Sequence, residues 1–319
     1  MIRSPSLPKQ GMQEGGTPDP DDGKGRRAAT AAAVGSILLW CTSGVSYASG
    51  GRLLGPMVYL TLISMIGVLT VALLHALQRR PLGDLLRLPL RVIVAGFCGV
   101  AFYSILLALA FGMAPERAIG QVNLLNYLWP VWIVLFSAFL IRGNTLSLPQ
   151  TAGVLLGFSG IVVAHGGADL LRLPDAPLPL AFALLGSILW AGYCVLLRRW
   201  QVPVEQGGTA LQFILCAAMA AGVGALRGEW QTMAPIGAEA VFWVLFGGIG
   251  PVGLAYRWWE IGMKEGNVPL IGTLAYFIPI GSTILIGLLF QEAMGPGLLP
   301  GAVLIAVGAW LAGRGATRQ

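Results

Sequence analysis

The stretch Leu125-Asn126-Tyr127-Leu128-Trp129-Pro130 recurs later in the chain as Leu274-Ala275-Tyr276-Phe277-Ile278-Pro279. Two further matches keep the same order at an offset of about 150 residues: Gly35-Ser36-Ile37-Leu38-Leu39-Trp40 with Gly186-Ser187-Ile188-Leu189-Trp190, and Gly153 and Gly160 with Gly301 and Gly308. Low-complexity apolar sequence can imitate itself. Because these matches include Trp, Tyr and Pro, we instead predict a duplicated chain.

The composition places both halves in a membrane. Hydrophobic residues make up 56% of the 319 residues and charged residues only 11%, whereas soluble proteins carry about 25% charged residues. A helix needs about 20 mostly apolar residues to cross a bilayer. Ten segments qualify and predict an all-α polytopic membrane protein: 28–48, 56–77, 90–113, 118–140, 149–166, 178–197, 208–226, 240–262, 267–290 and 296–313.

The ten spans divide into two repeats, residues 28–167 and 178–314, within one integrated transmembrane domain. Each repeat holds five spans, and because five is odd, the second repeat enters the membrane from the opposite side. Inverted repeats of this kind are typical of secondary transporters that work by alternating access. The polar residues 1–27 are expected to form a disordered cytoplasmic tail.

The basic residues predict an orientation. With the N-terminus inside, 15 of the 20 Lys and Arg residues fall on the cytoplasmic side, Arg257 falls within a span, and only Arg52, Arg117, Arg172 and Arg227 fall outside. This asymmetry predicts cytoplasmic N- and C-termini. Lys is rare beside Arg, and Ala and Gly are abundant, which indicates a GC-rich bacterial genome and hence a bacterial inner membrane. Membrane topology explains the net charge of +6 without a nucleic-acid partner. The four Cys residues lie in apolar runs without a CxxC motif, so no metal site or cofactor is expected.

The stretch from Leu274 to Gly308 resembles a known family. It combines Leu274 and Pro279 with Phe290-Gln291-Glu292, where the family shows an acidic residue after the helix, and with the pair Gly301 and Gly308. The chain is similar to the drug/metabolite transporter superfamily, with two EamA-type repeats, and within it to the bacterial exporters of aromatic amino acids. The first half departs from the pattern, because Arg142-Gly143-Asn144 stands at the acidic position.

Polar residues in the fourth span suggest a binding site. Asn123, Asn126 and Tyr127 share one helix face, and unsatisfied amides in hydrocarbon cost several kcal/mol. The face is therefore expected to line a cavity, although hydrogen bonding between helices is the alternative. Pro130 and its repeat partner Pro279 are expected to break their helices.

Aromatic residues deep within spans extend this candidate site. Trp and Tyr usually lie at the membrane interface, an explanation that fails for rings near mid-span. A cavity lined by such rings suits a planar or aromatic solute. The candidates on spans one, three, four, six, eight and nine are Trp40, Tyr103, Tyr127, Trp190, Tyr193, Tyr256 and Tyr276.

Arg257 and Glu260 form an oppositely charged pair three residues apart within the eighth span. They are predicted to form an inner gate or a handle for the charged groups of an amino acid. Interfacial snorkelling with a local salt bridge is the alternative. The sequence shows no carboxylate or His near mid-membrane, so we expect facilitated rather than strictly proton-coupled transport.

Together these features predict an amino acid exporter that functions as a monomer in the lipid bilayer. Export of other small metabolites or amphipathic drugs is the alternative. An intramembrane enzyme built on Ser159 is less favoured, because Gly157 and Gly160 around it suit helix packing. A channel is less favoured because one chain already contains the two-fold repeat. We therefore expect a transporter, not an enzyme.

Overall fold

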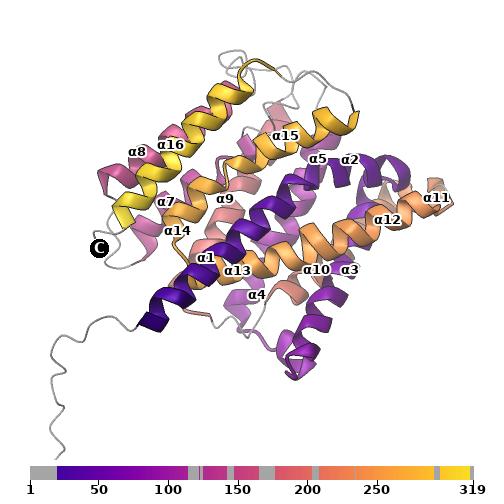
Figure 1. Ribbon diagram of the computed structural model, residues 1–319. Coiled ribbons are helices and arrows are strands. Elements are labelled where there is room, and N and C mark those ends of the chain that lie inside the picture. Colours follow the sequence, from indigo (N-terminus) through magenta and orange to yellow (C-terminus); the bar gives the residue numbers. More distant parts are fainter. Residues whose placement is uncertain are drawn as a thin grey trace, which may run out of the picture.

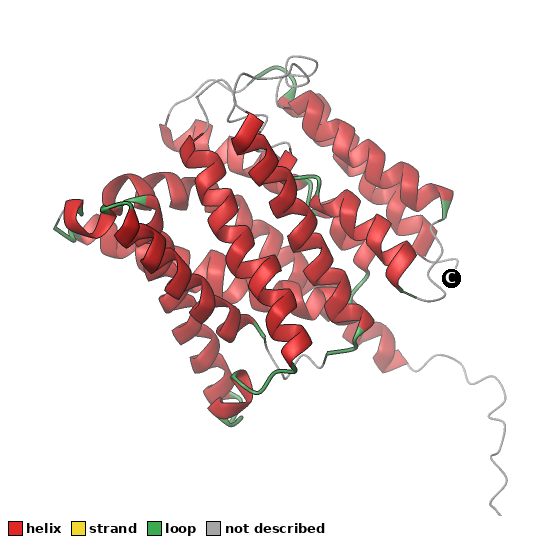
Figure 2. Cartoon of the chain, turned by 180° about the vertical axis from the view of Figure 1, so that it is seen from behind, coloured by secondary structure: helices red, strands yellow, loops and turns green. Residues whose placement is uncertain are grey.

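The computed structural model describes residues 20–113, 122, 125–141, 147–164, 177–202, 208–233, 235–290 and 295–316. Within these residues every regular element is a helix (Figures 1 and 2). Both ends of the described chain, the start of α1 and the end of α16, lie on the same side of the bundle in either view. This placement fits an even number of crossings.

Six helical segments are long and apolar enough to span a membrane: Gly23–Leu54, Pro56–Leu77, Leu90–Ala110, Pro177–Arg199, Thr209–Leu226 and Ala238–Glu265. Four shorter apolar helices complete the set: Trp129–Leu140, Leu148–Ala164, Leu270–Ser282 and Leu298–Gly308. These segments correspond one for one to the ten predicted spans. The chain is therefore a polytopic α-helical membrane protein.

The first half contains one departure from prediction. Helix α1 begins at Pro20, so residues 20–27 continue the first helix instead of belonging to the disordered tail. Pro20 at the first helical position and Asp21 and Asp22 in the first turn favour a helix start here, and these residues extend the helix beyond the apolar span. The elements of this half are α1 (Pro20–Cys41), α2 (Ser43–Leu54), α3 (Pro56–Leu77), η1 (Leu82–Leu85), α4 (Leu90–Gly96), η2 (Phe97–Phe102), α5 (Tyr103–Met113), α7 (Trp129–Leu140) and α8 (Leu148–Ala164).

The second half follows the same plan of long and interrupted helices. Its elements are α9 (Pro177–Arg199), α10 (Thr209–Leu226), α11 (Glu229–Thr232), α12 (Ala238–Gly247), η6 (Gly248–Leu254), α13 (Ala255–Glu265), α14 (Val268–Leu274), α15 (Phe277–Phe290) and α16 (Leu298–Ala316).

Two kinds of interruption recur at equivalent places in the halves. The third and eighth spans each contain a π-helical segment, η2 and η6, and such segments are rare outside functional regions. The fourth and ninth spans each break at a two-residue turn, Tyr127–Leu128 and Ala275–Tyr276. In both, a proline follows in the first turn of the next helix, where its missing N–H costs no hydrogen bond. Pro130 and Pro279 therefore stand just after the two helix breaks.

Helices α8 and α16 pack face to face through glycines (Figure 1). A Cβ added to Gly160 would lie 2.6 Å from the carbonyl oxygen of Gly301, and one added to Gly301 would lie 2.5 Å from that of Gly160. Only glycine permits this approach of two backbones. The predicted packing role of the glycines in the fifth span is confirmed.

Candidate functional site

Trp190 lies at the centre of a cluster of aromatic rings. It is 3% exposed and contacts five rings at centroid distances of 5.4 to 6.5 Å. Edge-to-face and stacked pairs of this kind stabilise by about 0.5–1.5 kcal/mol each beyond burial. We define the aromatic cluster as Trp190, the five rings that it contacts and Trp259, which contacts Trp40 and Trp129: Trp40, Tyr103, Trp129, Trp190, Tyr193, Tyr256 and Trp259.

The aromatic cluster joins the two halves of the protein. Trp40 on α1 meets Tyr256 and Trp259 on α13, each at a centroid distance of 5.2 Å. Its indole N–H also donates to the carbonyl oxygen of Pro251 in η6, at 2.9 Å. This hydrogen bond joins a ring of the first half to the π-helical segment η6 of the second half. It therefore fixes Trp40 at the junction between the two halves.

Tyr103 supplies the polar link to the fourth span. Its ring stacks on Trp190 at 5.8 Å with planes 26° apart. Its hydroxyl donates to Oδ1 of Asn126 at 3.2 Å, and Asn126 is only 6% exposed. Asn126 therefore makes an interhelical hydrogen bond, the alternative considered for it, within reach of the aromatic cluster.

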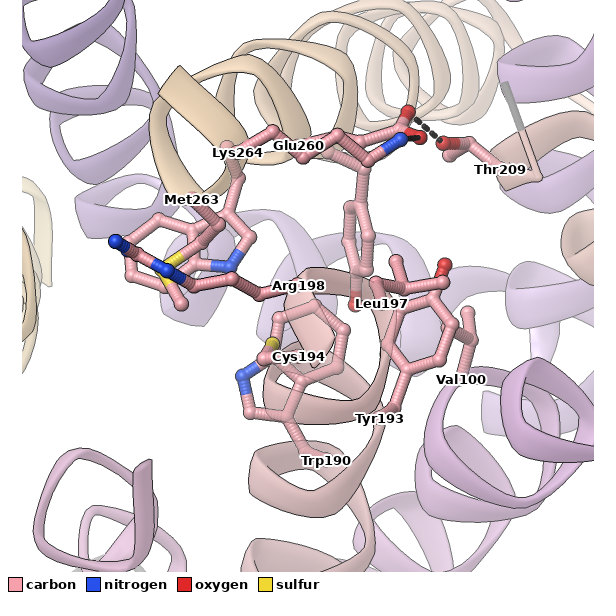
Figure 3. Close-up of a pocket in the computed structure, with 12 residues that line it drawn as sticks. Val100, Trp190, Tyr193, Cys194, Leu197, Arg198, Thr209, Glu260, Met263 and Lys264 are labelled. Atoms are coloured by element: carbon pink, nitrogen blue, oxygen red, sulfur yellow. Dashed lines mark hydrogen bonds and ion pairs between the residues drawn. The ribbon is translucent and has the colours of Figure 1, made fainter. Parts of the chain in front are cut away.

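A small cavity lies beside Trp190 (Figure 3). Its space is about 20 Å³, enough for roughly one water molecule. Sites for small organic ligands measure about 300–1,000 Å³, so these side chains must separate before an amino acid fits. The lining comes from η2, α9, α10 and α13: Val100, Trp190, Tyr193, Cys194, Leu197, Arg198, Thr209, Tyr256, Trp259, Glu260, Met263 and Lys264.

One wall of the cavity is charged. Glu260 is 6% exposed, and its carboxylate pairs with Nζ of Lys264 at 2.6 Å and with Nη1 of Arg257 at 3.4 Å. Thr209 on α10 donates to the same carboxylate at 3.1 Å. The predicted ion pair of Arg257 and Glu260 is present, but Lys264 lies closer to the Glu260 carboxylate than Arg257 does. Arg257 is not among the lining residues, so we give the name charged wall to Glu260 and Lys264.

The remaining predicted residues lie elsewhere. Tyr276 is fully buried in a second apolar cluster with Val154 and Ile161, where its ring packs on Gly157, so the structure does not bring it to the cavity. Tyr127 is half-buried and packs against both this cluster and the main core. Asn123 lies outside the described residues.

Among the site residues that the sequence analysis missed, four make contacts that shape the site. Trp129 and Trp259 belong to the aromatic cluster, with centroids 5.2 Å apart, and Thr209 and Lys264 hold Glu260. The spacing of Glu260 and Lys264 at i and i+4 could have revealed that pair. Nothing in the sequence indicated that Trp129 and Trp259 face each other.

The fifth span carries no arrangement suited to nucleophilic catalysis around Ser159 in the part that the structure describes. Ser159 is exposed, and its hydroxyl donates to the carbonyl of Leu155 on its own helix at 2.9 Å. Such back-bonding is ordinary for a helical serine. Among the described residues, no group of three His, Cys, Asp or Glu side chains is placed to hold a metal ion.

Known proteins match this chain over most of its length. The curated aromatic amino acid exporter YddG of Ancylobacter novellus is 35% identical over 90% of this chain and 97% of its own. The exporter of the same name from Salmonella typhimurium is 30% identical over 90% and 98%. A solved crystal structure of a protein 33% identical to this chain superposes with a TM-score of 0.79, covering 90% of this chain and 98% of that one.

The model of the EamA-like transporter family matches residues 178–314, the range predicted for the second repeat. The all-helical fold of the described residues and the relatives agree with this match, and a family of transporters supports the prediction that the protein is not an enzyme. The chain belongs to the EamA-like transporter family.

Proposed function

We propose that this protein exports aromatic amino acids across the bacterial inner membrane. The observation that carries the proposal is the aromatic cluster, in which Trp190 lines a cavity together with Tyr193, Tyr256 and Trp259. Flat rings offer stacking surfaces to an aromatic side chain. The names of the relatives from Ancylobacter novellus and Salmonella typhimurium support the same substrate class.

The proposed mechanism is alternating access by one chain in the lipid bilayer. The cavity of about 20 Å³ corresponds to a closed arrangement, which must widen toward one side at a time. The two π-segments and the two helix breaks offer places where spans can bend while their outer parts stay packed. In the proposed orientation both termini are cytoplasmic, so the charged wall lies toward the cytoplasm.

Transport is proposed to be facilitated and not strictly coupled to protons. Among the described residues, Glu260 is the only carboxylate that lines the cavity, and it is ion-paired with Lys264 in this closed arrangement. A solute ammonium can replace Lys264 there without any transfer of a proton. Proton-coupled carriers place a carboxylate or His where it can exchange protons with the solute. An imposed pH difference alone is therefore expected to drive no tryptophan accumulation in reconstituted vesicles, and accumulation would contradict this part of the proposal.

Counterflow in proteoliposomes tests the substrate class. Vesicles loaded with unlabelled tryptophan should take up labelled tryptophan transiently, and threonine or a cationic dye inside should support much less uptake. Protein-free vesicles are the control. Failure of every amino acid, with uptake of the dye, would replace this proposal by export of amphipathic drugs.

A further inference from the structure

Glu260 and Lys264 form an ion pair on the surface of the cavity. They lie one turn apart on α13, and their charged atoms are 2.6 Å apart. The side chains of Glu260 and Lys264 are 5% and 8% exposed. Both line the cavity, and Figure 3 shows them with Thr209 on one side, facing Trp190, Cys194 and Tyr193 across it.

A purely structural role explains this pair poorly. Desolvating two charges costs several kcal/mol per ion, and a well-packed apolar pair often stabilises as much or more. Ionisable residues inside membrane spans more often mark the path of a solute. The pair also borders the little free space that the site has, and a pair buried only for packing would need no cavity beside it.

The charges of this pair complement those of an α-amino acid. A zwitterion carries one ammonium and one carboxylate, so its ammonium can pair with Glu260 and its carboxylate with Lys264. The exchange replaces the ion pair between Glu260 and Lys264 by two between protein and solute, while Arg257 stays beside the Glu260 carboxylate. Because the internal pair must break first, the net binding energy stays modest, which suits a carrier that must also release its solute.

We propose that Glu260 and Lys264 are the subsite that receives the α-ammonium and α-carboxylate groups of the transported amino acid. The inference rests on the proposed function, and it deepens that function by assigning the recognition of the backbone groups. The solute's aromatic side chain then points from the charged wall toward Trp190, Tyr193 and Trp259, the apolar side of the same cavity.

Thr209 links this subsite to a change of shape. Its hydroxyl, on α10, donates to the Glu260 carboxylate on α13 at 3.1 Å. A solute ammonium on the same carboxylate competes with that bond and loosens α10 from α13. Entry of the solute thereby weakens a contact that closes the cavity, so binding and opening are coupled through Glu260.

Analogues that lack one charge test the subsite. Inhibition of labelled tryptophan counterflow is measured with tryptophan, tryptamine, which lacks the carboxylate, and indole-3-propionate, which lacks the ammonium. The unaltered protein should prefer tryptophan over either analogue by about tenfold or more. Lys264→Gln should abolish the preference over tryptamine, and Glu260→Gln the preference over indole-3-propionate. Glu265→Gln, an exposed neighbour on α13, should leave both preferences unchanged.

The exchange of both residues, Glu260→Lys with Lys264→Glu, controls for folding. It keeps an ion pair at the cavity and should restore the preference for the zwitterion. If the unaltered protein exchanges no amino acid, the proposed function fails. If it exchanges tryptophan but both single variants keep both preferences, the subsite is wrong and the function stands. Where a single variant does not fold, loss of the preference for the zwitterion in the folded exchanged pair has the same meaning.

Discussion

At the scale of single residues, the hydroxyl of Tyr103 links the aromatic cluster to the fourth span. Tyr103 stacks on Trp190 and donates to Asn126, which is 6% exposed. Tyr103→Phe keeps the ring and leaves the buried amide oxygen without this donor, at a cost of about 1–3 kcal/mol. The variant should melt at a lower temperature in detergent but still exchange tryptophan, because the stacking surface remains.

The matched control is Tyr47→Phe, since Tyr47 is 38% exposed and does not line the cavity. Equal melting temperatures for the two variants, both matching the unaltered protein, would show that the bond between Tyr103 and Asn126 does not stabilise the site.

The sequence predicts the residues of the site unevenly. Trp40, Trp190 and Tyr256 could be found because mid-span rings are not explained by the membrane interface. Trp129 and Tyr276 could not be placed, because each lies next to a helix break, and a two-residue turn rotates the helix that follows. The repeat equates Tyr276 with Tyr127, yet the turn directs Tyr276 into the packing against α8.

At the scale of elements, the α8–α16 contact depends on glycine. Gly301→Ala places a methyl group 2.5 Å from the carbonyl oxygen of Gly160, and a backbone atom cannot turn aside as a side chain can. The two helices must separate, at a cost of about 1–3 kcal/mol. Thermal unfolding in detergent should show this loss. Gly272→Ala, where an added Cβ meets nothing within 4 Å, should be neutral or slightly stabilising.

The sequence reveals the two helix breaks but not the two π-segments. Pro130 and Pro279 predict interruptions in the fourth and ninth spans, because proline removes a backbone donor. The π-segments η2 and η6 contain no comparable shared signal: Pro251 lies in η6, and η2 has no proline. Their equivalent positions become evident only when the two halves are compared in three dimensions.

At the scale of the whole molecule, span number and repeat follow from simple physics. The number of apolar segments about 20 residues long gives the number of membrane crossings. The order of the repeated motifs divides these crossings into two halves. Contacts between the halves are not accessible in this way, because rings such as Trp40 and Trp259 meet across more than 200 residues of sequence. The cavity therefore required the structure, although four of its twelve lining residues, Trp190, Tyr193, Tyr256 and Glu260, were already candidates.

Efflux of labelled phenylalanine from loaded proteoliposomes tests most directly whether this molecule is an alternating-access carrier of aromatic amino acids. If the two halves expose the cavity to only one side at a time, as proposed, efflux should saturate with internal phenylalanine. It should also accelerate when unlabelled phenylalanine is added outside, because a loaded carrier returns faster than an empty one. Efflux that rises in proportion to concentration and ignores external phenylalanine would contradict the account.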